Sequence, residues 1–251
     1  MVTPKDITEA AVGLRGVARR TPLLFVEELG VHLKLENEQP IGAFKIRGAY
    51  NAIRKLPDRA RQRGVITYSS GNHGQAVAYA AKQFGVRAVV TMPETAPAVK
   101  VEGVKKWGGE VVFAGRTSED RRIEAEAIAA RDGLAIVPPF DHPDIVAGQA
   151  TVALEIVEQL PAVEAVVVPV GGGGLISGVV AGLAAAQSRA VGCRDDRRRD
   201  DGRRAPLEID GAHRERRQRG SRAARGLRCH PRRLPRRACS SPTTTSRWSV
   251  P

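Results

Sequence analysis

Between about residue 64 and residue 186 the chain alternates short β-rich runs with helical patterns. The runs rich in Val, Ile and aromatic residues lie at 65–68, 87–92, 110–113, 135–137 and 165–170. The helical patterns between them lie at 75–84, 98–107, 118–131, 144–160 and 174–186. Strands that alternate with helices of this length indicate βαβ units and a parallel sheet. The predicted fold class is therefore α/β, with parallel-rich sheets flanked by helices.

Local signals refine some of these elements. Ser118 is predicted to be the N-cap of the 118–131 helix, with Glu119 and Asp120 in the first turn, where the helix dipole favours anions. The run at 165–170 is continuously apolar, which predicts a parallel strand covered on both faces.

The alternating pattern stops after Ala186. Residues 187–251 hold 19 arginines, no lysine and 7 acidic residues, a net charge of +12, whereas residues 1–186 hold a net charge of only +1. The three cysteines also lie in this Arg-rich segment, at spacings that indicate neither a disulfide framework nor a metal site. Low apolar content and high charge predict that this segment is disordered.

The remaining composition is that of a soluble globular protein. Apolar residues make up 42% of the chain. No stretch approaches the roughly 18 consecutive apolar residues that a membrane span needs. Residues 1–10 show no basic-then-apolar signal pattern, which predicts a cytoplasmic location without a membrane partner.

Two predicted strand-to-helix junctions are rich in glycine and small polar residues. They are Ser69-Ser70-Gly71-Asn72-His73-Gly74 and Gly171-Gly172-Gly173-Gly174. Ligands of parallel sheets bind at the carboxyl ends of strands, so both junctions are candidate site loops. Four glycines before a helix predict a cup for an anion such as phosphate, although a tight turn also explains them. The first loop is equally well a capped helix start.

A third segment, residues 37–49, carries a lysine between two apolar side chains. Phe44 and Ile46 flank Lys45 at the start of a predicted helix. Desolvation there would lower the pKa of the Lys45 amine, and a neutral amine is the nucleophile for a carbonyl group. Taken by itself, however, Lys45 is better interpreted as an ordinary solvated lysine.

Together the three segments resemble the fold type II family of pyridoxal-phosphate enzymes, and within it the threonine dehydratase and serine racemase branch. Residues 44–49 stand where that family carries the lysine that holds its cofactor. Residues 69–76 match the second family signature nearly letter for letter, and 171–175 sit where the family binds the cofactor phosphate. The resemblance covers about residues 5–186. It implies a smaller lobe at 64–141 and a larger, incomplete lobe at 1–63 plus 142–186.

The resemblance implies pyridoxal 5′-phosphate as the cofactor and a role for each matched residue. No metal is expected, because the residues with which the family binds one, just after the strand that follows the tetraglycine helix, are missing here. Lys45 would hold the cofactor and take the proton from the substrate's Cα, while Asn72 would bond the cofactor's ring hydroxyl and Phe44 would lie near the ring. The residues that would hold the phosphate are Gly171, Gly172, Gly173, Gly174 and Leu175. Those that would bind the substrate are Ser69, Ser70, Gly71 and His73. Ser70 occupies the position of the racemases' second acid/base, so Lys45 and Ser70 are the predicted catalytic residues.

The implied reaction is the removal of water from L-threonine or L-serine, which gives a 2-oxo acid and ammonia. A serine racemase or a hydroxyaspartate dehydratase of the same branch is the first alternative. An inactive remnant with a basic tail is the second. The family is usually homo-oligomeric, and no specific nucleic-acid partner is expected.

The Arg-rich segment departs from the family, whose larger lobe continues well past the tetraglycine helix. Residues 190–192 begin the expected strand, and residues 193–196 interrupt it. Arginine without lysine is typical of GC-rich DNA read in a shifted frame, which makes a frameshift our favoured interpretation. The rival is a basic arm that binds nucleic acid or an anionic surface. If a one-base shift near codons 187–192 of the gene does not restore family sequence, the frameshift interpretation is wrong.

Overall fold

The computed structural model describes residues 2–69 and 71–195 of the chain. These residues belong to one compact unit, Met1–Asp201, and the second unit, Gly202–Pro251, lies outside the described residues. In chain order the elements are α1 (Pro4–Gly13), β1 (Leu23–Val26), the 3₁₀ helix η1 (Glu27–Leu29), β2 (Val31–Lys34), the 3₁₀ helix η2 (Glu36–Glu38), α2 (Lys45–Lys55), α3 (Asp58–Arg63), β3 (Val65–Tyr68), α4 (Asn72–Gln83), β4 (Ala88–Met92), α5 (Ala98–Lys106), β5 (Glu110–Phe113), α6 (Ser118–Asp132), β6 (Ala135–Ile136), α7 (Pro143–Gln159) and α8 (Gly174–Asp195).

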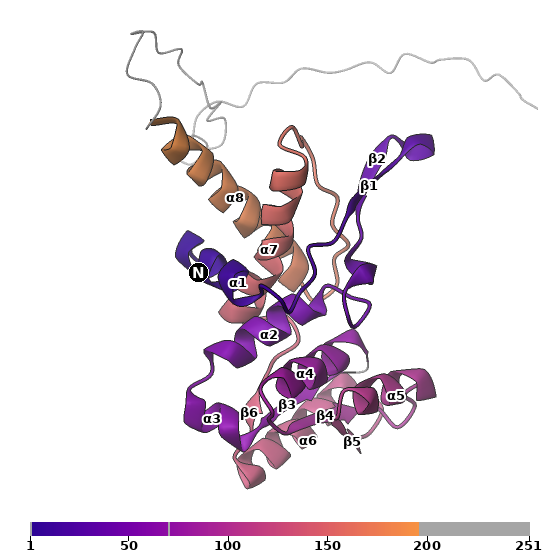
Figure 1. The fold of residues 1–251 in the computed structure, drawn as a ribbon. Coiled ribbons are helices and arrows are strands. Elements are labelled where there is room, and N and C mark those ends of the chain that lie inside the picture. Colours follow the sequence, from indigo (N-terminus) through magenta and orange to yellow (C-terminus); the bar gives the residue numbers. More distant parts are fainter. Residues whose placement is uncertain (1, 70, 196–251) are drawn as a thin grey trace, which may run out of the picture. The chain divides into compact units, whose positions relative to one another are not determined.

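A four-stranded parallel sheet in the order β5-β4-β3-β6 confirms the α/β fold class. Neighbouring residues of β3 face opposite sides because side chains alternate along a strand. Val65 packs with Ala76 and Val77 of α4, whereas Ile66 packs with Ala125 and Ile128 of α6. Helices therefore cover both faces of the sheet, as Figure 1 shows in its lower half.

Helices α1, α2, α7 and α8 form a second cluster, held together by close contacts between small residues. A methyl group at Gly148 would lie 2.5 Å from the Arg47 carbonyl oxygen and 2.6 Å from the Gly48 Cα, so α2 and α7 cross with their backbones nearly touching. A methyl group at Gly182 of α8 would likewise lie 2.4 Å from the Ala150 carbonyl oxygen. Helix α2 contacts both α4 and α7 and so joins this cluster to the sheet. The division of the chain into a smaller and a larger lobe stays a prediction.

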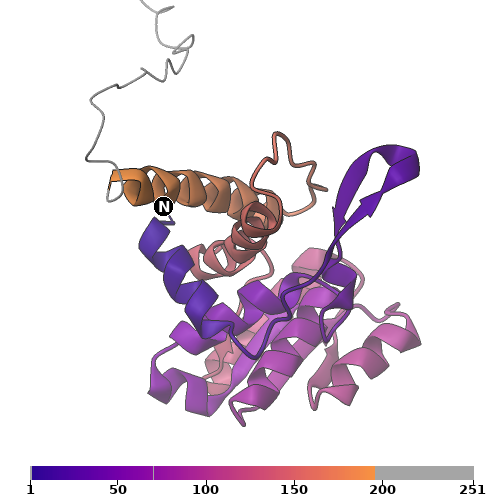
Figure 2. The same cartoon turned by 45° about the horizontal axis from the view of Figure 1, so that its top comes forward.

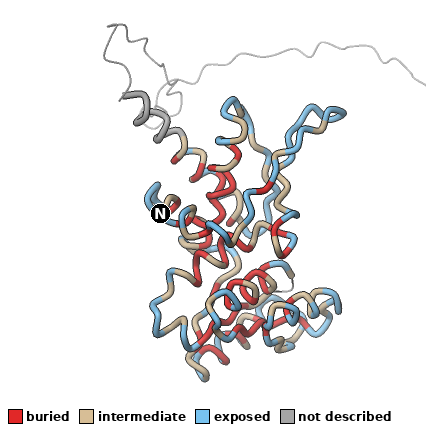
Figure 3. The backbone as a smooth tube through the Cα atoms, in the orientation of Figure 1, coloured by how far each residue is buried: buried red, intermediate tan, exposed pale blue. Residues whose placement is uncertain are grey.

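The antiparallel hairpin of β1 and β2 projects from the helices, as Figure 2 shows, and sequence patterning did not predict it. Its apolar side chains are mostly exposed, with Phe25 52% and Leu33 43% accessible, and Figure 3 shows its surface as largely exposed. Because neither face of the hairpin packs against a core, the period-2 pattern that marks a half-buried strand is absent.

Three expectations from the sequence need correction. Residues 165–170 form no strand, and Val167 and Val170 are 98% and 69% exposed, because the described residues offer this segment no neighbouring strand. The N-cap of α6 is Thr117 rather than Ser118: its side chain accepts from the Asp120 amide, and Asp120 reciprocates in a capping box. Helix α8 continues past Ala186 to Asp195. The predicted disorder of residues 196–251 lies outside the described residues.

Candidate active site

Lys45 is the first residue of α2, and its side chain is half-buried. Its Nζ donates to the Pro139 carbonyl oxygen at 2.6 Å and lies 5.5 Å from the centre of the Phe44 ring. Burial lowers the pKa of the Lys45 amine, and no carboxylate of the described residues opposes that shift. The structure thus gives Lys45 the desolvated setting that the flanking apolar residues predict.

His73 lies in the first turn of α4 and is only 3% exposed. Its Nε2 lies 3.2 Å from the Val137 carbonyl oxygen; since a carbonyl only accepts, Nε2 carries the hydrogen and Nδ1 is a bare acceptor. Nδ1 is buried and has no partner among the described residues. Burial, reinforced by the positive charge of Lys45, lowers the pKa of His73 to about 3. The imidazole is therefore neutral and lies close to Lys45.

The other residues of this loop differ in exposure. Asn72 is exposed at the start of α4, and Ser69 is half-buried, with its Oγ accepting from the Gly71 amide at 3.2 Å. The amides of Asn72 and His73 donate to no described residue. Open amides at a helix N-terminus attract anionic groups. Ser70, the predicted second acid/base, lies outside the described residues.

The tetraglycine segment leads directly into α8. Gly173 has a φ of +84°, which glycine adopts without strain. A methyl group at Gly172 would lie 2.3 Å from the Phe140 ring, whereas one at Gly171 would meet nothing within 4 Å. The first amide of α8 that bonds a described residue is that of Ser177, which donates to the Gly173 carbonyl at 3.0 Å. The earlier amides, including that of Leu175, have no acceptor among the described residues and can bind an anion.

One short segment, residues 137–140, touches all three predicted site segments. The Val137 carbonyl faces His73, the Pro139 carbonyl accepts from Lys45, and the Phe140 ring lies against Gly172. No sequence pattern assigned this segment to the site. The available signal was Pro138-Pro139 directly after a strand: prolines cannot donate to a strand ladder, so the backbone leaves the sheet here and its carbonyl groups can accept from other donors.

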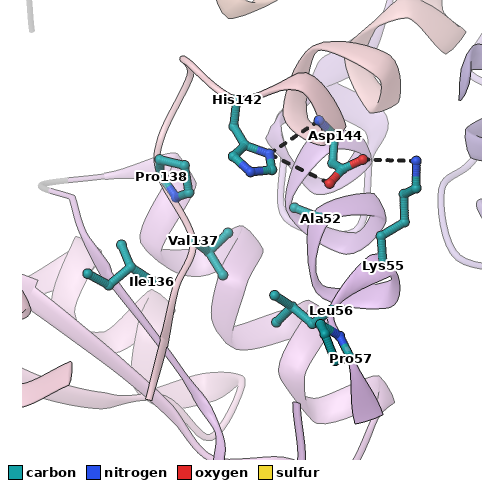
Figure 4. Close-up of a pocket in the computed structure, with 9 residues that line it drawn as sticks. All are labelled: Ala52, Lys55, Leu56, Pro57, Ile136, Val137, Pro138, His142 and Asp144. Carbon is teal, nitrogen blue, oxygen red and sulfur yellow. Dashed lines mark hydrogen bonds and ion pairs between the residues drawn. The ribbon is translucent and has the colours of Figure 1, made fainter. Parts of the chain in front are cut away.

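The strand-to-α7 connection also lines a cavity of about 240 Å³ that contains no predicted site residue. In Figure 4, His142 and Lys55 approach Asp144 from two sides of this cavity, and the Lys55–Asp144 ion pair measures 3.0 Å. Lys55 is the last residue of α2, about 15 Å along the helix from Lys45. The cavity therefore holds none of the predicted site residues, but Val137, whose carbonyl faces His73, is one of the residues that line it.

A buried ion cluster fixes the helix that begins with Lys45. Arg47 is 1% exposed and bonds both oxygens of Glu36 at 2.8 Å and both oxygens of Glu155 at 2.6 and 3.0 Å. Lys34 reaches the same Glu155 at 2.5 Å. Burial opposes the charge on Arg47, but its two carboxylate partners outweigh burial and raise its pKa. Residues from η2, α2 and α7 are thereby held in one arrangement.

The sequence matches the family described as "Pyridoxal-phosphate dependent enzyme" over residues 14–240. A parallel α/β sheet with glycine-rich loops before α4 and α8, and a desolvated lysine at the start of α2, agrees with that match. The chain belongs to this family of pyridoxal-phosphate-dependent enzymes. The family match extends into the Arg-rich segment, whereas the individual relatives described next align with 77% of the chain or less.

Individual relatives fall in the expected branch. The chain is 43% identical over 202 residues to L-threo-3-hydroxyaspartate ammonia-lyase of Saccharomyces cerevisiae, covering 77% of this chain and 61% of that protein. It is 46% identical over 185 residues to L-threonine ammonia-lyase of Thermotoga maritima, covering 71% of this chain and 46% of that protein. Maize serine racemase has a similar structure, with a TM-score of 0.72 and 38% sequence identity. The match covers 75% of this chain and 58% of that protein. The chain thus spans about half to three-fifths of the length of these relatives.

Within the described residues, two further features are absent. No helix there is long and apolar enough to cross a membrane. No cluster of three or more His, Cys, Asp or Glu side chains there is arranged to hold a metal ion.

Proposed function

We propose that this chain binds pyridoxal 5′-phosphate at Lys45 and acts as an ammonia-lyase that removes water from L-threonine or L-serine. The observation that carries the proposal is the Lys45 amine: it is half-buried, has a lowered pKa and has no carboxylate partner among the described residues. An aldehyde-bearing cofactor needs such an amine, because only the neutral form attacks a carbonyl.

The residues present fit the cofactor. The open amides before Ser177 and the glycines that precede them form a site for a phosphate group. The buried His73 Nδ1 lacks a hydrogen-bond donor, which a bound ligand can supply. When bound, pyridoxal phosphate supplies an electron sink for negative charge at the substrate's Cα.

The chain's own residues would bind the cofactor and the substrate and transfer the proton. Lys45 Nζ would hold the cofactor and then take the proton from Cα, a role that needs the neutral amine and is favoured by its lowered pKa. Asn72, exposed beside this site, would bond the cofactor's ring, and Phe44 would lie near it. Ser69, Gly71 and the open amides of the α4 N-terminus would bind the substrate carboxylate. We keep Ser70 as the proposed second acid/base.

Titration of the purified full chain with pyridoxal phosphate tests cofactor binding. We expect an absorbance band at the edge of the visible range and, after borohydride reduction, a cofactor mass on the peptide that contains Lys45. Lys45→Ala should abolish both, whereas Lys55→Ala, on the same helix, should leave them intact. A label spread over many lysines, or one that survives Lys45→Ala, would contradict the proposal.

Product analysis tests the reaction and its substrate. L-threonine should give 2-oxobutanoate and ammonia, and Lys45→Ala should lower that rate by about 10³-fold or more, the scale of a lost general base. L-serine and 3-hydroxyaspartate belong in the same assay, since the two curated relatives are named for threonine and hydroxyaspartate. Chiral analysis of recovered serine tests racemisation, which the likeness to maize serine racemase makes the second candidate.

A further inference from the structure

Lys100 places a second ammonium group beside the loop that precedes α4. A methyl group built on Gly71 would lie 3.6 Å from Lys100 Nζ and 3.9 Å from its Cδ and Cε, so the lysine side chain lies over the open face of this glycine. Lys100 is half-buried. Neither the proposed function nor the sequence motifs give this residue a role.

The packing of α5 against α4 explains how Lys100 reaches this position. Gly103 of α5 faces Gln75 of α4, where a methyl group would lie 2.6 Å from Gln75 Cδ. Lys100 precedes Gly103 by three residues and Gly71 precedes Gln75 by four. Both steps are one helical turn, so the same packing register brings Lys100 opposite Gly71.

The helix itself does not account for a lysine at this point. Lys100 is the third residue of α5, in the first turn, where the helix dipole disfavours a positive charge. Its side chain forms no hydrogen bond or ion pair with any residue in the described part of the chain. Among the described residues, this half-buried ammonium therefore keeps three donors for a ligand.

The surroundings of Lys100 indicate the chemistry of that ligand. The Asn72 and His73 amides in the adjacent turn have no acceptor among the described residues, and the α4 N-terminus adds positive potential. The buried Nδ1 of His73, on the same turn, needs a hydrogen-bond donor. A small amino acid carries both a carboxylate and donor groups, and so meets both requirements.

We infer that Lys100 is a further binding residue of this site, whose ammonium takes the carboxylate of the small amino-acid substrate. The inference rests on the proposed function for the identity of the substrate. An ammonium that already lies against Gly71 can reach a carboxylate held by the Asn72 and His73 amides. A charge-assisted bond of this kind is about twice as strong as a neutral one.

The first test needs no cofactor, so it is independent of the proposed function. Lysines of the full chain are acetylated for a short time in the presence of propionate or of propionamide, and the sites are quantified by mass spectrometry. We expect propionate to slow acetylation of Lys100 at least threefold and propionamide to leave it unchanged. Lys105, exposed on the same helix, is the internal control. Equal effects of the two probes on Lys100, or equal slowing of Lys105, would overturn the inference.

The second test uses the cofactor-loaded chain and compares Lys100→Gln with Lys105→Gln. Lys100→Gln should raise the KM for L-threonine about tenfold, the scale of one lost charge-assisted hydrogen bond, with kcat and the cofactor absorbance unchanged. Lys100→Arg should restore part of the loss, and Lys105→Gln should have no effect. A lowered kcat at unchanged KM would overturn the inference. A wild-type chain that binds no cofactor would instead overturn the proposed function, and the protection experiment would still decide the role of Lys100.

Discussion

Arg47 and Glu155 lie 108 residues apart in sequence and are joined by two parallel hydrogen bonds of 2.6 and 3.0 Å. Arg47 stands two residues after Lys45 on α2, and Glu155 lies near the end of α7. Glu36 accepts from Nε and Nη2 of the same guanidinium, and Lys34 forms an ion pair with Glu155. The proposed cofactor lysine thus begins a helix that is held in place by four charges, of which Arg47 is buried and the other three are partly buried.

Glu155→Gln should therefore destabilise the chain substantially. The substitution keeps the shape but leaves Arg47 and Lys34 with Glu36 as their single carboxylate, and breaking a buried pair from one side costs about 3–5 kcal/mol. Glu158→Gln on the same helix is the matched control: its pair with Arg20 is 3.4 Å long and exposed, so its loss should cost no more than about 0.5 kcal/mol. Urea unfolding measures both values. Similar losses for the two variants would show that the buried cluster contributes no more than a surface pair.

Sequence patterning predicted the parallel sheet and its helices well, because the two central strands β3 and β4 are buried between helices and the edge strands β5 and β6 pair with them. Strand β5 has the predicted bounds, and α4 to α7 lie within a few residues of theirs. Patterning failed where tertiary context decides: the β1–β2 hairpin has no buried face, and the apolar 165–170 run has no strand to pair with in the described residues. Periodicity reports burial, so it cannot find a hairpin that packs against no core, and it cannot supply a missing neighbour.

The candidate site could be predicted in its parts but not in its assembly. The sequence points to Lys45, the 69–74 loop and the four glycines, each by local chemistry. It does not reveal that Val137, Pro139 and Phe140 touch all three: Pro138-Pro139 marks the end of a strand, but the groups that the neighbouring carbonyls meet depend on tertiary packing. Lys100 was missed for a similar reason: its proximity to Gly71 depends on the packing of α5 against α4.

The lowered pKa of Lys45 predicts unusual reactivity of its amine. Burial disfavours the ammonium form, so the neutral amine should be present at a lower pH in the folded chain than in the unfolded chain. Reductive methylation of Lys45, followed by mass spectrometry across a pH series, measures this directly. The pH at which the methylation rate of Lys45 reaches half of its plateau should be lower in buffer, where the chain is folded, than in urea, where it is unfolded. Coincident midpoints would mean that Lys45 is effectively solvated.

His73 should make the chain sensitive to acid. Its pKa of about 3 in the folded state is lower than the ordinary value near 6.5, so the unfolded chain binds more protons between these two pH values. The stabilisation from neutral, buried His73 is complete above pH about 6.5, and it should be lost as pH falls, by about 1.4 kcal/mol per unit at most. His73→Gln, which does not titrate, should show a flatter stability profile from pH 6.5 to 4 in urea unfolding. If the slope is the same for both chains, other groups cause the acid sensitivity.

The glycine loop offers a matched pair of substitutions. Gly172→Ala would place a methyl group 2.3 Å from the Phe140 ring, whereas Gly171→Ala would place one in open space. Because Phe140 is 39% exposed and its ring can shift, we expect Gly172→Ala to cost about 1–2 kcal/mol of unfolding free energy and Gly171→Ala less than about 0.5. Equal costs in urea unfolding would mean that Phe140 does not rest on the loop in solution.

The exposed apolar run at residues 165–170 should make the chain associate with itself. Val167 and Val170 are 98% and 69% exposed, in a segment of high β-propensity that pairs with no strand of the described residues. Such segments are templates for pairing with another chain. The double substitution Val167→Lys and Val170→Lys adds charge to this exposed segment without changing the core. In light scattering, the double variant should remain monomeric at concentrations where the original chain forms larger species. Val12→Lys, at a 55% exposed position on α1, is the control for added charge alone. If Val12→Lys lowers association as much as the double variant, net charge rather than the unpaired run governs solubility.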